Sequence, residues 1–122
     1  MARSKNIPSA AEAIVFDGFI NKWQQKLSLG DWRIERGIKP AKQAMASVEF
    51  NPAARLAVYR LGDFGSEAIT PASLEATAIH ELLHVRLFDL IQISSGKATD
   101  EEVEAAEHSV VNVIEKLLKD MA

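Results

Sequence analysis

The sequence contains no cysteine among its 122 residues. Disulfides and thiolate-bound metals are therefore excluded, and any transition-metal site must be built from histidine and carboxylate side chains. A chain without disulfides suits a reducing compartment, and we expect the cytoplasm.

Long apolar runs are also missing. No stretch reaches the roughly 20 apolar residues that a membrane-spanning helix needs, and the first nine residues lack the apolar centre of a secretory signal. The formal net charge of −3 gives no global attraction for nucleic acid. We therefore expect neither a membrane nor a nucleic acid as partner.

The composition is that of a folded protein, with 48% hydrophobic and 25% charged residues. A chain of this length supports one hydrophobic core and is too short for two domains of ordinary size. No repeat or linker divides it. Residues 1–122 are accordingly expected to form a single domain.

Capping motifs predict where the helices begin. Ser9 with Glu12 and Thr99 with Glu102 have the spacing of a capping box, and Thr70 precedes a proline at the first helical position. Helical spacing of apolar residues follows each of these starts. The predicted helices are 10–28, 71–93 and 99–119.

Three short segments between the first two helices favour strands. Residues 32–36 and 46–50 alternate with a period of two, and 56–61 is rich in strand-forming residues. A turn at Asn51-Pro52 predicts that the last two strands form an antiparallel hairpin. The order of helix, three strands, helix and helix predicts an α+β domain.

The helix 71–93 carries His80-Glu81-Leu82-Leu83-His84, an HExxH pattern. Histidines four residues apart lie on the same face of a helix, so both imidazoles can bind one zinc ion. Glu81 lies beside that face, where it can act as general base toward a metal-bound water without being a ligand. Two packed core or boundary histidines are the alternative reading.

A catalytic zinc ion usually has three protein ligands. Leu87 and Leu90 stand at the glycine and third-histidine positions of the extended HExxHxxGxxH motif, so the third ligand must come from elsewhere. The last helix is the natural donor. Its inward face is defined by Val103, Val110, Val111, Ile114, Leu117, Leu118 and Met121.

Glu107 falls near the middle of this apolar face. A carboxylate buried there would be costly without a cation, which favours Glu107 as the third ligand. His108 is the next candidate, because imidazole is a common zinc ligand, and Glu104 is the third. A salt bridge or a solvated helix end remains the alternative for Glu107.

Two further polar residues are expected to be structural. Tyr59 is predicted to pack in a strand with its hydroxyl in water, although a tyrosine can also stabilise an oxyanion. Arg86 projects away from His84 around the helix, so we expect it to be solvated or in a salt bridge.

The HExxH segment Ala78–His84, followed by a later helix with Glu107-His108-Ser109-Val110-Val111-Asn112, resembles the small metallopeptidases of phages and prophages. It is more distantly similar to the gluzincin peptidases, which take two histidines from HExxH and a glutamate from a later helix. The later helix departs from their ExxxD pattern, because Val111 follows Glu107 at that spacing. The resemblance implies a minimal zincin fold, with a sheet whose edge strand holds an extended peptide.

These patterns predict a zinc-dependent hydrolase, and specifically a metallopeptidase acting on a peptide or protein substrate. Zinc would be held by His80, His84 and Glu107, with Glu81 as the catalytic base. The alternative function is a non-catalytic, metal-stabilised protein-binding domain. A nuclease with the same metal chemistry is a third possibility, which the acidic composition does not support.

Overall fold

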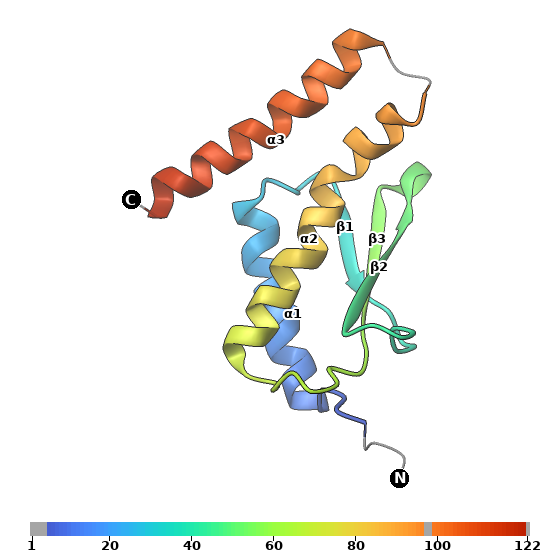
Figure 1. Ribbon diagram of the computed structural model, residues 1–122, viewed down its shortest axis with the longest axis vertical. Coiled ribbons are helices and arrows are strands. Elements are labelled where there is room, and N and C mark those ends of the chain that lie inside the picture. The colour runs from blue at the N-terminus through green and yellow to red at the C-terminus, as the bar shows by residue number, and fades with distance from the viewer. Residues whose placement is uncertain (1–4, 97–98, 122) are drawn as a thin grey trace.

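The computed structural model describes residues 5–96 and 99–121, and it confirms an α+β architecture. Three helices accompany one three-stranded mixed sheet (Figure 1). α1 and α2 lie side by side against the sheet, while α3 crosses the far end of α2. Within the described residues, no helix has the length and apolar character needed to cross a membrane.

Helix α1 (Ala10–Lys26) begins at the predicted capping box. The Ser9 hydroxyl accepts a hydrogen bond from the Glu12 backbone amide, and the Glu12 carboxylate accepts one from the Ser9 amide. Phe16 and Ile20 are fully buried against the rest of the core. The sequence prediction for this helix is confirmed to within two residues at its end.

The sheet has the strand order β1-β3-β2, formed by β1 (Arg33–Arg36), β2 (Ala46–Asn51) and β3 (Leu56–Leu61). β2 and β3 form the predicted antiparallel hairpin around a short 3₁₀ turn, Pro52–Ala54. β1 pairs with β3 in parallel, which the local sequence patterns do not specify. β2 therefore forms one edge of the sheet.

Side chains alternate between the two faces of the sheet along each strand, which gives the sheet one apolar and one polar face. Ala46, Val48 and Phe50 of β2 belong to the core on the helix side or border it. Tyr59 of β3 is also buried there, and its hydroxyl donates a 2.7 Å hydrogen bond to Asp17 of α1. The expectation that this hydroxyl lies in water is thus wrong, because α1 covers the strand.

Helix α2 (Pro71–Ser94) is the central element of the fold. The predicted Thr70 cap is present, with its side chain accepting from the Ser73 amide. Leu74, Leu82 and Val85 are fully buried, and α2 packs against both α1 and β2. The helix thereby holds the HExxH segment next to the edge strand.

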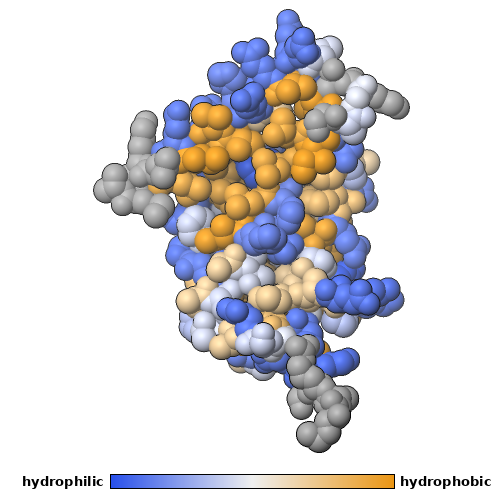
Figure 2. All heavy atoms as spheres, viewed as in Figure 1, coloured by the Kyte–Doolittle hydropathy of each residue, from blue (hydrophilic) through white to orange (hydrophobic). Residues whose placement is uncertain are grey.

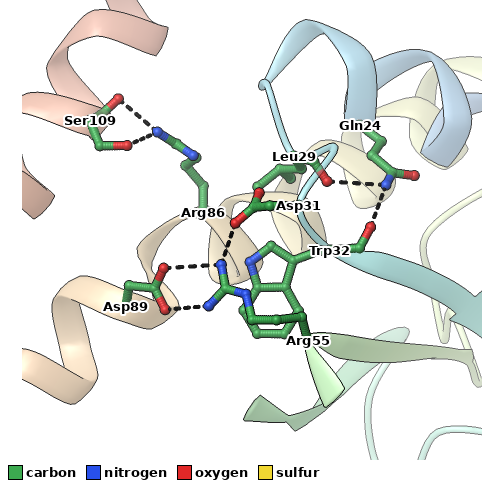
Figure 3. A network of polar contacts seen from close by, with 8 residues as sticks. All are labelled: Gln24, Leu29, Asp31, Trp32, Arg55, Arg86, Asp89 and Ser109. Carbon is green, nitrogen blue, oxygen red and sulfur yellow. Dashed lines mark hydrogen bonds and ion pairs between the residues drawn. The ribbon is translucent and has the colours of Figure 1, made fainter. Parts of the chain in front are cut away.

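Arg55 connects α2 to the hairpin and to the loop before β1 (Figure 3). Its guanidinium binds Asp89 of α2 at 2.8 Å, contacts Asp31 and lies 4.0 Å from the centre of the Trp32 ring. Arg55 itself has a left-handed backbone, with φ at 49°. One side chain thus joins the loop before β1, the hairpin and α2.

Helix α3 (Asp100–Met121) packs against α2 along a narrow stripe. Val113 is buried in this contact, whereas Val111 and Ile114 are 43% and 48% exposed. Part of the face that was predicted to point inward, which includes Val111 and Ile114, is therefore exposed. The side chains of Leu118 and Met121, also expected to face inward, lie outside the described residues.

Arg86 makes the polar link between α2 and α3 (Figure 3). Its guanidinium donates to the Ser109 carbonyl at 2.9 Å and contacts the Ser109 hydroxyl. It is half-buried, and its Nε has no hydrogen-bond partner among the described residues. Arg86 therefore makes a polar contact between two helices, to a serine, and is neither the solvated nor the salt-bridged side chain that its position on α2 suggested.

Candidate metal centre

His80 and His84 face one another on the surface of α2. Their Nε2 atoms are 3.3 Å apart, and the ring centres are separated by 4.9 Å. Two nitrogen ligands at the usual 2.0 to 2.1 Å from a tetrahedral zinc ion lie about 3.3 to 3.4 Å apart. Both rings are exposed. The pair therefore has the separation of two adjacent ligands of a zinc site, and without a metal the same contact is a hydrogen bond between the two rings.

Glu81 differs from the two histidines in its environment. It is only 6% exposed, because its position on α2 turns it toward β2 instead of solvent. Burial raises the pKa of the Glu81 carboxyl, while the neighbouring His80 and His84 act in the opposite direction. Within the described residues, no group donates a hydrogen bond to this carboxylate, so it remains available to accept a proton.

Two hollows of about 430 Å³ each open beside these residues, between α2 and β2. Both reach His80 and Glu81. The first hollow is lined in addition by Met45, Ala46, Glu67, Ser73, Ala76 and Thr77. The second hollow is lined in addition by Ala46, Ser47, Val48, Phe50, His84, Phe88, Ile91 and Gln92. Glu81 thus lies where the two hollows meet.

The edge strand β2 runs along both hollows. The Gly62 amide donates a 2.8 Å hydrogen bond to the Met45 carbonyl, which fixes the alternation of the antiparallel ladder. By that alternation, the amide and carbonyl groups of Ala46, Val48 and Phe50 point away from β3. The cleft therefore presents, among the described residues, an unpaired strand edge beside the histidine pair.

Aromatic rings form the wall of the second hollow. Phe88 of α2 stacks on Phe50 of β2 with ring centres 4.3 Å apart, and both rings contact Trp32. Sequence reasoning did not assign Phe88 to the site. Its spacing offers the clue, since it follows His84 by one helical turn and lies on the same side of α2.

The three candidates for a third ligand lie on α3, apart from the histidine pair. Glu107, His108 and Glu104 are all exposed, and His108 lies 3.7 Å from Glu104 in an i,i+4 contact. The expectation that Glu107 is buried in the packed face is wrong, because α3 touches α2 only along the neighbouring stripe. Among the residues described, no group of three histidine or acidic side chains surrounds a common point.

The surface next to the site is apolar. Figure 2 shows hydrophobic side chains gathered over α3 and the adjoining part of α2. These helices expose Leu83, Ile91, Val111 and Ile114 by 40% to 54%. Contiguous apolar surface of this kind commonly marks a contact with another molecule.

Comparison with known proteins adds no relative: no family model matches the chain, and no curated protein or solved structure is detectably similar to it.

Proposed function

We propose that this chain is a zinc-dependent hydrolase, and specifically a metallopeptidase of the HExxH type. One observation carries the proposal: the His80 and His84 Nε2 atoms have the separation of two zinc ligands, and the buried Glu81 carboxylate beside them accepts no hydrogen bond from the described residues. A pair of core histidines without a metal would not explain the exposure of both rings.

His80 and His84 would hold the metal through Nε2. Glu107 stays the predicted third ligand, with His108 and Glu104 as the alternatives, and separate replacement of each tests this assignment. Zinc, when bound, polarises the scissile carbonyl and makes water a better nucleophile near neutral pH. The chain lacks thiolates, so its histidine and carboxylate donors suit zinc in a catalytic site.

Glu81 has the role of general base. Its carboxylate accepts the proton of the attacking water and returns it to the leaving amine. The free edge of β2 holds an extended peptide by main-chain hydrogen bonds, as the resemblance to minimal zincins implies.

The test compares wild-type protein with Glu81→Gln on a pool of quenched fluorescent peptides. We expect the variant to keep its zinc and to lose at least about 100-fold in cleavage rate, the usual contribution of a general base. Glu115→Gln, which changes an exposed glutamate on α3, is the matched control. Full cleavage by the Glu81→Gln protein would disprove the mechanism.

A second candidate is a non-catalytic, metal-stabilised protein-binding domain. The exposed apolar residues of α2 and α3 favour it, since such a surface suits a protein partner. X-ray absorption of the zinc-loaded protein separates the two candidates. Four protein ligands without an open position would support the binding domain, whereas three would support the hydrolase.

A further inference from the structure

The first hollow has an unusual polar lining. Besides His80 and Glu81, its polar side chains are Glu67, Ser73 and Thr77, while Met45, Ala46 and Ala76 supply apolar surface. Each of these three polar groups is limited, by charge or by existing hydrogen bonds, in what it can still bind. Together they determine which kind of ligand the hollow can satisfy.

Both hydroxyl protons are already used. The Ser73 hydroxyl donates to the Ala68 carbonyl at 2.7 Å and accepts from the Thr70 amide at 2.9 Å, which leaves it one lone pair. The Thr77 hydroxyl donates to the Ser73 carbonyl at 2.8 Å. A hydroxyl has only one proton to donate, so each oxygen can offer a ligand nothing but acceptor capacity. Neither residue can therefore satisfy a carboxylate or a carbonyl in the hollow.

Glu67 adds a negative charge to this set of acceptors. Its backbone is anchored, because its amide donates to the Phe64 carbonyl at 3.0 Å and its carbonyl accepts from Asn6 at 2.8 Å. Its exposed side chain, by contrast, makes no hydrogen bond or ion pair within the described part of the chain. The carboxylate is thus held at the hollow by its backbone and remains free to bind a cation.

We propose that the first hollow binds the long basic side chain, lysine or arginine, of an extended peptide substrate. An ammonium or guanidinium group carries only donors, which matches the acceptor groups that Glu67, Ser73 and Thr77 present. The aliphatic stem of such a side chain packs on Met45, Ala46 and Ala76, while its head reaches Glu67. This inference rests on the proposed peptidase function, because it identifies the substrate class of the same cleft.

The orientation of β2 gives the order of the two subsites. The strand runs from Ala46 beside the first hollow to Phe50 beside the second. Antiparallel pairing is the more stable mode of strand addition, so the peptide runs from the second hollow toward the first. The preferred substrate has an apolar or aromatic residue on the amino side of the scissile bond and a basic residue on the carboxyl side.

The experiment measures binding separately from cleavage. Fluorescent peptides that differ only in a lysine, norleucine or glutamate at the carboxyl-side position are titrated into zinc-loaded Glu81→Gln protein and followed by anisotropy. Cleavage of the same peptides by wild-type protein gives kcat/KM. We expect lysine to bind about tenfold more tightly than norleucine, the usual gain from one charge-assisted contact, and glutamate to bind most weakly.

Variants of Glu67 then test whether its carboxylate is responsible for the lysine preference. Glu67→Gln should reduce the lysine preference to about twofold or less, and Glu67→Lys should make the glutamate peptide the better ligand. Glu115→Gln should leave the preference unchanged. Because Glu67 anchors the loop through its backbone alone, its variants should fold, which circular dichroism checks.

The outcomes separate this inference from the proposed function. Lysine-selective binding that depends on Glu67 supports the subsite even where no peptide is cleaved, although the peptidase proposal would then fail. Cleavage without any preference for a basic residue, unchanged in Glu67→Gln, would leave the peptidase standing and overturn the subsite. Loss of zinc from Glu67→Gln would also overturn it, because Glu67 would then be a metal ligand.

Discussion

Replacing Glu81 by glutamine should stabilise the metal-free protein. The Glu81 side chain is 6% exposed, and none of the described residues donates a hydrogen bond to it. Among the described side chains, only the Arg86 Nε is fully buried without a partner, so the Glu81 carboxylate keeps some contact with water. A largely buried polar group without a protein partner costs up to about 1 to 3 kcal/mol, and more when the group is charged. Glutamine has nearly the same shape but no charge, so it removes part of that cost.

We take about 1 kcal/mol as the expected gain in the free energy of unfolding, because the opening of both hollows lets some water reach the carboxylate. For a domain of this size, that gain corresponds to a rise of about 3 to 6 °C in Tm.

The assay is urea unfolding at pH 7 in the presence of a chelator, followed by tryptophan fluorescence. Wild-type protein and Glu115→Gln should share one midpoint, and Glu81→Gln should unfold at a higher urea concentration. A Glu81→Gln protein that is less stable than wild type by 1 kcal/mol or more would refute the reasoning. The carboxylate would then take part in a stabilising network, and it would not be the isolated proton acceptor that the structure indicates.

Three further predictions test the fold that holds the site. Arg55→Ala should lower the free energy of unfolding by about 2 kcal/mol, because its two ion pairs and its ring contact are lost. Arg55→Gly should be about 1 kcal/mol less destabilising than Arg55→Ala, because the backbone φ of 49° favours glycine. Equal losses for the two variants in urea unfolding would argue against the left-handed backbone. The single tyrosine, Tyr59, has a pKa well above its usual range because of burial and its hydrogen bond to Asp17, so absorbance at 295 nm should show no phenolate at pH 10 to 11 until the chain unfolds. Since the pKa of Tyr59 is raised, the stabilisation from its protonated hydroxyl is present below about pH 10 and declines as the pH rises further. Titration of Tyr59 near pH 10 in the folded state would instead place its hydroxyl in solvent. The contact with Lys22 lowers the pKa of Glu75, so this contact stabilises the fold above about pH 4.3, and the stabilisation is lost as the pH falls through the pKa of Glu75 in the folded protein. The urea midpoints of wild type and Glu75→Gln should therefore converge in acid. A difference that stays constant with pH would contradict this.

Local rules were sufficient for the elements of this fold. The hydroxyl of Ser9 and the Thr70-Pro71 pair mark helix starts in the sequence because capping depends on residues within one turn. The hairpin followed from the turn at Asn51 in the same way. The parallel pairing of β1 with β3 was not predictable, because it depends on contacts between segments far apart in the chain.

The centre of the candidate site was also accessible from the sequence, since HExxH spacing alone brings His80 and His84 to one side of a helix. The exposed position of Glu107 was not predictable from the sequence. Its predicted burial assumed that every apolar residue of α3 faces the core, whereas within the described residues α3 packs mainly on α2 and leaves Val111 and Ile114 exposed. How much of an amphipathic helix is covered depends on how many elements pack against it, which periodicity does not reveal.

Metal binding by the histidine pair is the central claim, and zinc titration tests it most directly. Chelator-treated wild-type protein is titrated with zinc by calorimetry, and its zinc content is measured after gel filtration, alongside His80→Ala and His84→Ala. The geometry predicts one zinc per wild-type chain and loss of the bound metal in both variants. No zinc binding by folded wild-type protein, or equal binding by all three proteins, would contradict the account.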